Sequence, residues 1–227
     1  MKDWEACYKN GETPWDKGLP APPLVDLIDR FGTALFSGGP VLVPGCGLGH
    51  DVRLLADLGI PAYGLDISQT AVAVASALTQ HPDARFEHGD FLDPAWPQSR
   101  KFKAIWEHTC FCAIDPTLRG AYARAVTAVL DPGGIFAGVF YLTPSVPGDD
   151  DAGPPFEATV EELDALFFQW FDRIDGWVPE QCYPGREGRE WIGIFRKLPV
   201  EMLDRSVANL KKGKVSAPVD LSLYQEG

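Results

Sequence analysis

The stretch VLVPGCGLGHDV, residues 41–52, decides the fold. A short apolar run, Val41 to Val43, leads into three glycines, Gly45, Gly47 and Gly49, and then into a helical pattern. A strand that turns at glycines into a helix is the opening unit of an open α/β sheet, whose ligands lie at the carboxyl ends of the strands. Glycine lets the main chain approach a bound group closely and supplies the positive φ of such a turn. The stretch therefore predicts a ligand site at this turn.

Strand and helix patterns alternate on both sides of the turn. Apolar runs predict strands at 41–43, 61–68, 84–91, 102–108, 133–142, 171–180 and 189–198. Helical spacing of apolar residues predicts helices at 23–36, 50–59, 69–80, 116–130 and 159–171. This alternation predicts a mostly parallel sheet with helices on both faces.

Local signals support several of these helices. Ser68, Asp115 and Thr159 precede helical patterns and are expected to act as N-caps, and Thr159 and Glu162 have the spacing of a capping box. In the helix at 50–59, an apolar face is expected to consist of Val52, Leu55 and Leu58.

The two ends of the chain lack this regular pattern. Residues 1–23 are rich in Trp, Gly and Pro without a sustained period, and they are expected to lie irregularly over the domain as a lid arm. We expect one domain over residues 1–198. Residues 199–227 are expected to form an amphipathic helix and a loose end.

Charge and composition exclude several classes of function. The net charge of −12 opposes binding to nucleic acid or to an anionic membrane. No apolar run approaches the roughly 20 residues of a membrane span, and the first residues lack the apolar core of a signal peptide, so a cytoplasmic protein is expected. The five cysteines are scattered, and reduced thiols are expected. Cys110 and Cys112 would share one side of an extended strand, but no second pair completes a zinc site, and no metal is expected.

Acidic residues end the next two strands. Asp66 follows the glycine turn by about 20 residues, the spacing at which a carboxylate meets ribose hydroxyls. Asp90 and Phe91 end the following strand and offer a carboxylate for an exocyclic amine and a ring for an adenine face. These features predict an adenosine ligand. Because His50 follows Gly49, the Gly-x-Gly-x-x-Gly pattern of NAD enzymes is broken, so a nucleotide-dependent oxidoreductase is disfavoured and S-adenosylmethionine is favoured.

Seven ordered blocks of sequence carry a family resemblance. WEACYKNGETPWDKG, VLVPGCGLGHDV, GLDIS, FCAIDP, LDPGG, GPPF and GREGRE together resemble the thiopurine, thiol and halide methyltransferases, most closely the branch that methylates halide, thiocyanate or small thiols. The likeness runs from Trp4 to Leu198. It implies the class I methyltransferase fold, a Rossmann-like seven-stranded sheet with an antiparallel last strand. It also implies S-adenosylmethionine as cofactor and S-adenosylhomocysteine as product.

The resemblance also implies the site residues. The candidate cofactor contacts are Trp4, Tyr8, Trp15, Gly45, Cys46, Gly47, Asp66, Ile67, Asp90, Phe91 and His108. Three positions depart from the family pattern. Tyr8 stands where relatives often have Trp, His108 stands where many have Tyr, and Phe156 stands in the expected substrate pocket where close relatives have Tyr.

Methyl transfer from a sulfonium is an in-line displacement, for which the protein aligns the reactants and excludes water. Trp4, Tyr8 and Trp15 on the arm are expected to close over the sulfonium, whose charge ring faces attract. A thiol is partly ionised at neutral pH, and halide or thiocyanate needs no deprotonation, so neither requires a dedicated base. An oxygen or nitrogen acceptor would require one, and His108 is the candidate for a base or, alternatively, a group that packs on the cofactor.

An anionic acceptor would need a local positive charge. Arg186, at a basic position of the family, and Arg189 offer one, unless Arg186 pairs with Glu187, Glu190 or the acidic residues 149–151. The expected function is methyl transfer to a small soft nucleophile, with thiols ahead of halide or thiocyanate. An oxygen or nitrogen acceptor, an oxidoreductase and a non-catalytic binding protein are the alternatives.

Overall fold

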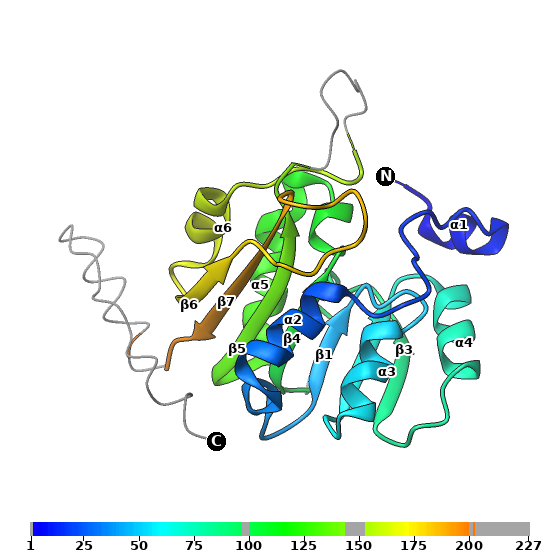
Figure 1. Ribbon diagram of the computed structural model, residues 1–227, viewed down its shortest axis with the longest axis horizontal. Helices are drawn as coiled ribbons and strands as arrows, with labels where there is room; N and C mark the ends of the chain where they lie inside the picture. Colours follow the sequence, from blue (N-terminus) through cyan, green and yellow to red (C-terminus); the bar gives the residue numbers. More distant parts are fainter. Residues whose placement is uncertain (1, 97–99, 144–152, 200–201, 203–227) are drawn as a thin grey trace.

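One seven-stranded sheet forms the centre of the molecule (Figure 1). The computed structural model describes residues 2–96, 100–143, 153–199 and 202. The strands are β1 (Val41–Pro44), β2 (Ala62–Asp66), β3 (Ala84–His88), β4 (Phe102–His108), β5 (Leu130–Tyr141), β6 (Phe171–Trp177) and β7 (Glu190–Lys197), and their order in the sheet is β3-β2-β1-β4-β5-β7-β6. The first five strands pair in parallel, whereas β7 lies antiparallel to both β5 and β6. The expected sheet with its antiparallel last strand is confirmed.

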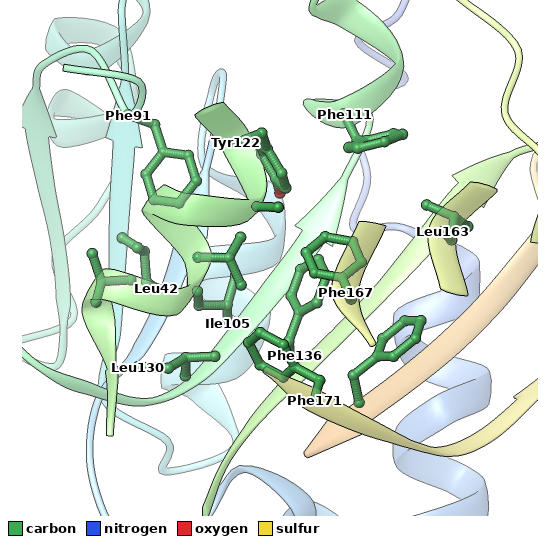
Figure 2. Packing of buried hydrophobic residues seen from close by; sticks show 14 of the residues in the cluster. Leu42, Phe91, Ile105, Phe111, Tyr122, Leu130, Phe136, Leu163, Phe167 and Phe171 are labelled. Carbon is green, nitrogen blue, oxygen red and sulfur yellow. The ribbon is translucent and has the colours of Figure 1, made fainter. Parts of the chain in front are cut away.

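Helices cover both faces of the sheet. The helices are α1 (Trp4–Asn10), α2 (Pro22–Phe31), α3 (His50–Asp57), α4 (Gln69–Ala77), α5 (Arg119–Val129) and α6 (Val160–Phe167), with short 3-10 turns at Thr33–Phe36, Phe111–Ala113 and Pro116–Leu118. One apolar layer packs α2 and α3 on the sheet, and the other packs α5 and α6 on the opposite face. Figure 2 shows rings in the second layer, where Phe136 of β5 packs against Phe167 of α6 and Phe171 of β6.

The arm contains a helix that the sequence pattern did not predict, so the expectation of an irregular arm was wrong for α1. Asp3 accepts a hydrogen bond from the amide of Ala6 and caps the N-terminus. Gly11, with φ of 72°, ends the helix. Because α1 has only seven residues, its apolar positions do not repeat often enough to form a period.

Two predicted segments have different geometry. The helix expected at 23–36 ends at Phe31, because Gly32 has φ of 68° and the chain resumes as a separate 3-10 turn. Cys110 and Cys112 do not alternate on a strand, since Cys110 leads into the turn Phe111–Ala113. The expectation of one continuous helix was therefore wrong, and the condition under which Cys110 and Cys112 would share one side of a strand is not met.

The capping predictions were mostly confirmed. Ser68 accepts from the amide of Ala71, and Thr159 accepts from the amide of Glu162. The carboxylate of Glu162 bonds Arg119 on α5 instead of completing a capping box. Val52 and Leu55 are buried as expected, but Leu58 follows the end of α3 and is 42% exposed, so its assignment to the buried face was wrong.

Two segments for which the sequence made a prediction lie outside the described residues, namely the acidic residues 149–151 and the tail from residue 203 onward. The domain boundary at residue 198 and the helix expected in the tail stay predictions. Within the part of the chain that the structure describes, no helix is long and apolar enough to cross a bilayer.

Candidate functional site

The glycine turn lies at the carboxyl edge of the sheet, between β1 and α3. Gly45, Gly47 and Gly49 have φ of 60°, 52° and 77°, a region that L side chains rarely adopt. A Cβ atom on Gly47 would lie 2.7 Å from the hydroxyl of Tyr8, and one on Gly49 would collide with the ring of Phe86. Gly49 thus serves packing on β3, whereas Gly47 faces the arm.

A Cβ atom on Gly45 would lie 2.9 Å from the Cβ of Cys110. The tip of β4, which ends at His108, therefore lies against the first glycine of the turn. Cys46 points its thiol the other way, toward Gly64 of β2. The turn is consequently in contact with its neighbouring strands on both sides.

Asp66 ends β2 and holds the turn in place. Its side chain is 6% exposed, and its two oxygens accept from the amides of Gly47 and Ser68, both at 2.8 Å. Burial raises the pKa of Asp66. A carboxylate has about four acceptor positions, so two remain for the hydroxyls of a ligand.

The next candidates lie at the tips of β2 and β3. Ile67 is 46% exposed and presents apolar surface beside Asp66. Asp90 is exposed, and its carboxylate accepts from the amide of Leu92. Phe91 is buried, with its ring 5.3 Å from that of Tyr122 in the core shown in Figure 2. Contact of these three side chains with an adenine ring stays a prediction.

The arm brings its aromatic residues together beside the turn. The rings of Trp4 and Trp15 meet edge to face at 5.2 Å, and the indole nitrogen of Trp15 donates to the hydroxyl of Tyr8 at 3.2 Å. The ammonium of Lys2 lies 5.1 Å and 4.8 Å from the centres of the Trp4 and Trp15 rings. This aromatic cluster of Trp4, Tyr8 and Trp15 already holds a cation.

Glu5 anchors α1 to the start of α4, beside which α1 lies in Figure 1. Its carboxylate accepts from the hydroxyl of Ser68 at 2.6 Å and from the hydroxyl and amide of Thr70 at 2.8 and 3.1 Å. These bonds, the one from Ser68 first, lower the pKa of Glu5 to about 2. Because the folded pKa lies below the ordinary 4.5, the contribution of Glu5 is complete above that value and is lost as the pH falls toward 2.

Substitution of Glu5 by Ala is expected to release the arm without unfolding the domain. Backbone hydrogen exchange in residues 4–10 should become at least about tenfold faster, while exchange in β4 and β5 stays unchanged. The matched control is Lys9→Ala, which removes only an exposed ion pair with Glu5 and should change little. Equal exchange in all three proteins would show that Glu5 does not hold the arm.

His108 is paired with a buried acid that the sequence interpretation missed. The Nδ1 atom of His108 lies 3.2 Å from Oδ2 of Asp51, in the first turn of α3. Asp51 is 7% exposed and also accepts from the amide of Ala21 at 2.7 Å and from the indole of Trp106 at 2.8 Å. Burial alone would raise its pKa, but the hydrogen bond and charge of His108, with the other two donors, lower it.

The other ring nitrogen of His108, Nε2, is buried and has no hydrogen-bond partner among the described residues. The imidazole stacks on the ring of Tyr183 at 6.1 Å and 28°. Thr109, the next residue, has φ of 63°, a strained value for a side chain branched at Cβ. Backbone strain and an unsatisfied nitrogen thus coincide at the tip of β4.

Arg186 and His108 both lie against the ring of Tyr183. Its guanidinium is 5.3 Å from the ring centre of Tyr183 and 5.0 Å from that of Tyr141, and it bonds Oε1 of Glu190 at 2.8 Å. Of the predicted alternatives, pairing with Glu190 is the one observed. Glu190 is 2% exposed, and its Oε2 has no partner among the described residues.

Two further predicted residues contact the main chain. The guanidinium of Arg189 donates to the carbonyl of Thr143 at 2.7 Å. Phe156 is partly buried, and its amide donates to the carbonyl of Cys112 at 2.7 Å, beside the tip of β4. Phe156 therefore lies near the turn Phe111–Ala113, and its place in an acceptor pocket stays a prediction.

Comparison with known proteins gives a consistent result. The profile described as Thiopurine S-methyltransferase (TPMT) matches residues 1–176. The chain is 34% identical over 202 residues to Thiocyanate methyltransferase 1 of Brassica oleracea, covering 86% of this chain and 84% of the relative. It is also 34% identical over 200 residues to Probable thiol methyltransferase 2 of Arabidopsis thaliana, with the same coverage of 86% and 84%.

Solved structures share the fold. One solved structure concerns the conversion of a disulfide bond into a thioacetal group during echinomycin biosynthesis. Its TM-score is 0.65 and its identity is 26%, and the match covers 87% of this chain and 91% of that chain. The 1,6-didemethyltoxoflavin-N1-methyltransferase of Burkholderia thailandensis, solved with S-adenosylhomocysteine, has a TM-score of 0.64 and 18% identity, with coverage of 86% and 85%. The second likeness concerns the fold alone.

Proposed function

The chain belongs to the thiopurine S-methyltransferase family, and from this premise we propose that it methylates a small thiol or sulfide in preference to halide or thiocyanate. As a family member it is an S-adenosylmethionine-dependent methyltransferase that acts on a soft nucleophile. The curated relatives carry names for thiocyanate and thiol methylation. The acceptor is therefore the open question.

The proposed cofactor site depends on Asp66, a buried carboxylate with free acceptor positions beside the main chain of Gly47. We assign its remaining acceptor positions to the ribose hydroxyls, and the main chain of the turn to the amino-acid part of the cofactor. Ile67, Asp90 and Phe91 would take the adenine ring.

The aromatic cluster fits the charged sulfur of the cofactor. The Lys2 ammonium over the rings of Trp4 and Trp15 supports a position for a cation there. When bound, the cofactor supplies a methyl group on a positively charged sulfur. The arm would exclude water from that group, which keeps an attacking nucleophile unsolvated.

The charges around the proposed acceptor site favour binding of a neutral methyl acceptor over binding of a permanent anion. We propose that Arg186 and Phe156 border the acceptor, together with His108. Since Glu190 already pairs with Arg186 and the chain carries a net charge of −12, little positive charge is left to attract halide or thiocyanate. Five cysteines without disulfides fit a reducing cytoplasm, where small thiols are kept reduced.

An oxygen or nitrogen acceptor is the second candidate, because the pairing of His108 with Asp51 is an arrangement suited to a general base. The same assay separates the candidates.

The test is a panel of acceptors with headspace gas chromatography for volatile methyl products and detection of S-adenosylhomocysteine. Ethanethiol and sulfide are expected to give kcat/KM at least about tenfold above that for iodide or thiocyanate. Reactions without the methyl donor serve as the control. Methyl iodide or methyl thiocyanate as the dominant product would contradict the proposed preference.

A further inference from the structure

We propose that His108 removes the proton of the acceptor thiol and that Asp51 is the positioning residue that directs the free nitrogen of His108 to this task. The inference rests on the proposed function, since it names a protic acceptor for the same site. It goes beyond that function because thiol methylation does not by itself require a base in the protein, since a thiol can also lose its proton to solvent before it binds.

The contacts of Asp51 decide which nitrogen of His108 carries a proton. An amide and an indole N–H can only donate, so the carboxylate is the acceptor for Ala21 and Trp106. The third contact, with Nδ1 of His108, must also be donated to the carboxylate, because an unprotonated Nδ1 would set a lone pair against an oxygen lone pair. In the neutral ring, Nε2 is then left with a lone pair.

Nε2 has the features of an atom that forms a hydrogen bond to a ligand. It is buried and has no partner within the described ranges, an arrangement that costs free energy unless a ligand supplies a hydrogen bond. The next residue, Thr109, holds a strained φ of 63°. Cys110, one position further, contacts the glycine turn, so the end of β4 that carries His108 lies next to the proposed cofactor site.

Other polar groups around the ring are already engaged. The hydroxyl of Tyr183 donates to the carbonyl of Leu19 at 2.7 Å. The carboxylate of Glu107 accepts from two backbone amides and from a tyrosine hydroxyl. Arg186 lies against the ring of Tyr183 and bonds Glu190. Of the described charged groups around the ring, Asp51 is the one that bonds His108, whereas Glu107 acts on His108 through its charge.

The proposed step balances as follows. The S–H bond of the thiol breaks, its proton passes to Nε2, and the electron pair stays on sulfur. That sulfur forms the new bond to the methyl carbon, while the electrons of the old bond return to the sulfur of the cofactor. The imidazolium formed on His108 is stabilised by Asp51 and later releases its proton to solvent.

The variant that isolates the base is His108→Asn. An asparagine amide can take the place of Nδ1 and keep the contact with Asp51, but it has no atom at the place of Nε2. Methylation of ethanethiol at pH 7 is expected to fall by about 100-fold or more. The rate of the variant with ethanethiol should recover as the pH rises toward the pKa of the free thiol. Because thiocyanate has no proton to lose, its methylation should fall by at least about tenfold less than that of ethanethiol, and this smaller loss should not depend on pH.

The matched control is His81→Asn, a histidine outside the site whose Nδ1 accepts from the amide of Asp83. It should leave both acceptors unaffected. Asp51→Asn is expected to shift the His108 tautomer toward a protonated Nε2, seen as exchanged nitrogen shifts in the 15N NMR spectrum of the cofactor-free protein. If this variant does not fold, the imidazole shifts of the wild-type protein test the tautomer alone.

A readout without turnover uses benzenethiol bound to the protein saturated with S-adenosylhomocysteine. The wild-type protein is expected to show thiolate absorbance below the pKa of the free thiol, and His108→Asn is not. Equal loss of ethanethiol and thiocyanate turnover in His108→Asn, a protonated Nε2 in the wild-type protein, or thiol turnover that is unaffected at every pH would each overturn the inference. Failure of the proposed function itself would look different, because the wild-type protein would then methylate no thiol at all.

Discussion

Substitution of Asp66 by Ala is expected to weaken the binding of S-adenosylhomocysteine by about 100-fold, because it removes the acceptor of two ligand hydroxyls, each bond to a charged group contributing about 1.5 kcal/mol. The substitution also leaves the amides of Gly47 and Ser68 without their acceptor, so the turn loses its fixed position. Isothermal calorimetry measures the affinity, and circular dichroism checks that the variant is folded. An affinity within about twofold of the wild-type value would refute this role of Asp66.

The matched control is Asp83→Ala, an exposed aspartate before β3, at the opposite end of the strands from Asp66. It should bind S-adenosylhomocysteine like the wild-type protein. The raised pKa of Asp66 adds a signature in pH. Ribose hydroxyls would stabilise the carboxylate, so binding lowers this pKa, and the affinity should fall as the pH is lowered through the pKa of the free protein. Asp66→Asn should abolish this dependence.

The fold was predictable from local patterns because strand and helix patterns alternate along the chain and the strands are strongly apolar. Buried strands such as the one that begins at Val41 are continuous apolar runs, and Ser68 and Thr159 mark helix starts by local hydrogen bonds. The errors in the predicted elements arose where one residue, rather than a repeated pattern, determines the local structure. α1 depends on the cap from Asp3 rather than on a period, and the break at Gly32 depends on one positive φ.

The site was predictable only in part, because some of its contacts join residues that are far apart in the sequence. The glycines and Asp66 occupy places that the strand pattern itself defines, so their meeting at one edge follows from the topology. The pairing of Asp51 with His108 joins residues 57 positions apart, and no local pattern specifies it. In the sequence, Asp51 resembles an ordinary acid in the first turn of a helix. The link between Glu190 and Arg186 was open because several acids could have taken that place.

Glu107 is the most deeply buried acid among the described residues, and its removal is expected to have the largest effect on stability. Glu107 is 0% exposed, and its Oε1 accepts from the amides of Cys110 and Phe111 at 2.8 and 2.7 Å. Its Oε2 accepts from the hydroxyl of Tyr122, a ring in the core of Figure 2. Glu107→Ala would leave three buried donors without an acceptor and create a cavity, so the free energy of unfolding should fall by about 4 kcal/mol. Denaturant unfolding measures this, and Tyr122→Phe, which removes one donor, should cost about 1 kcal/mol.

Glu107→Gln separates the charge of Glu107 from its hydrogen bonds. Burial raises the pKa of Glu107 from the ordinary 4.5 to about 6, although its hydrogen bonds oppose this. Because the folded protein binds this proton more tightly than the unfolded chain, Glu107 makes the folded state less stable as the pH rises from 4.5 to 6, by about 2 kcal/mol in all, and the penalty stays constant above that range. A glutamine keeps an acceptor for both amides and carries no charge. The free energy of unfolding of Glu107→Gln relative to the wild-type protein should therefore rise by about 2 kcal/mol between pH 4.5 and 7, and a difference independent of pH would show that Glu107 titrates normally in the folded protein.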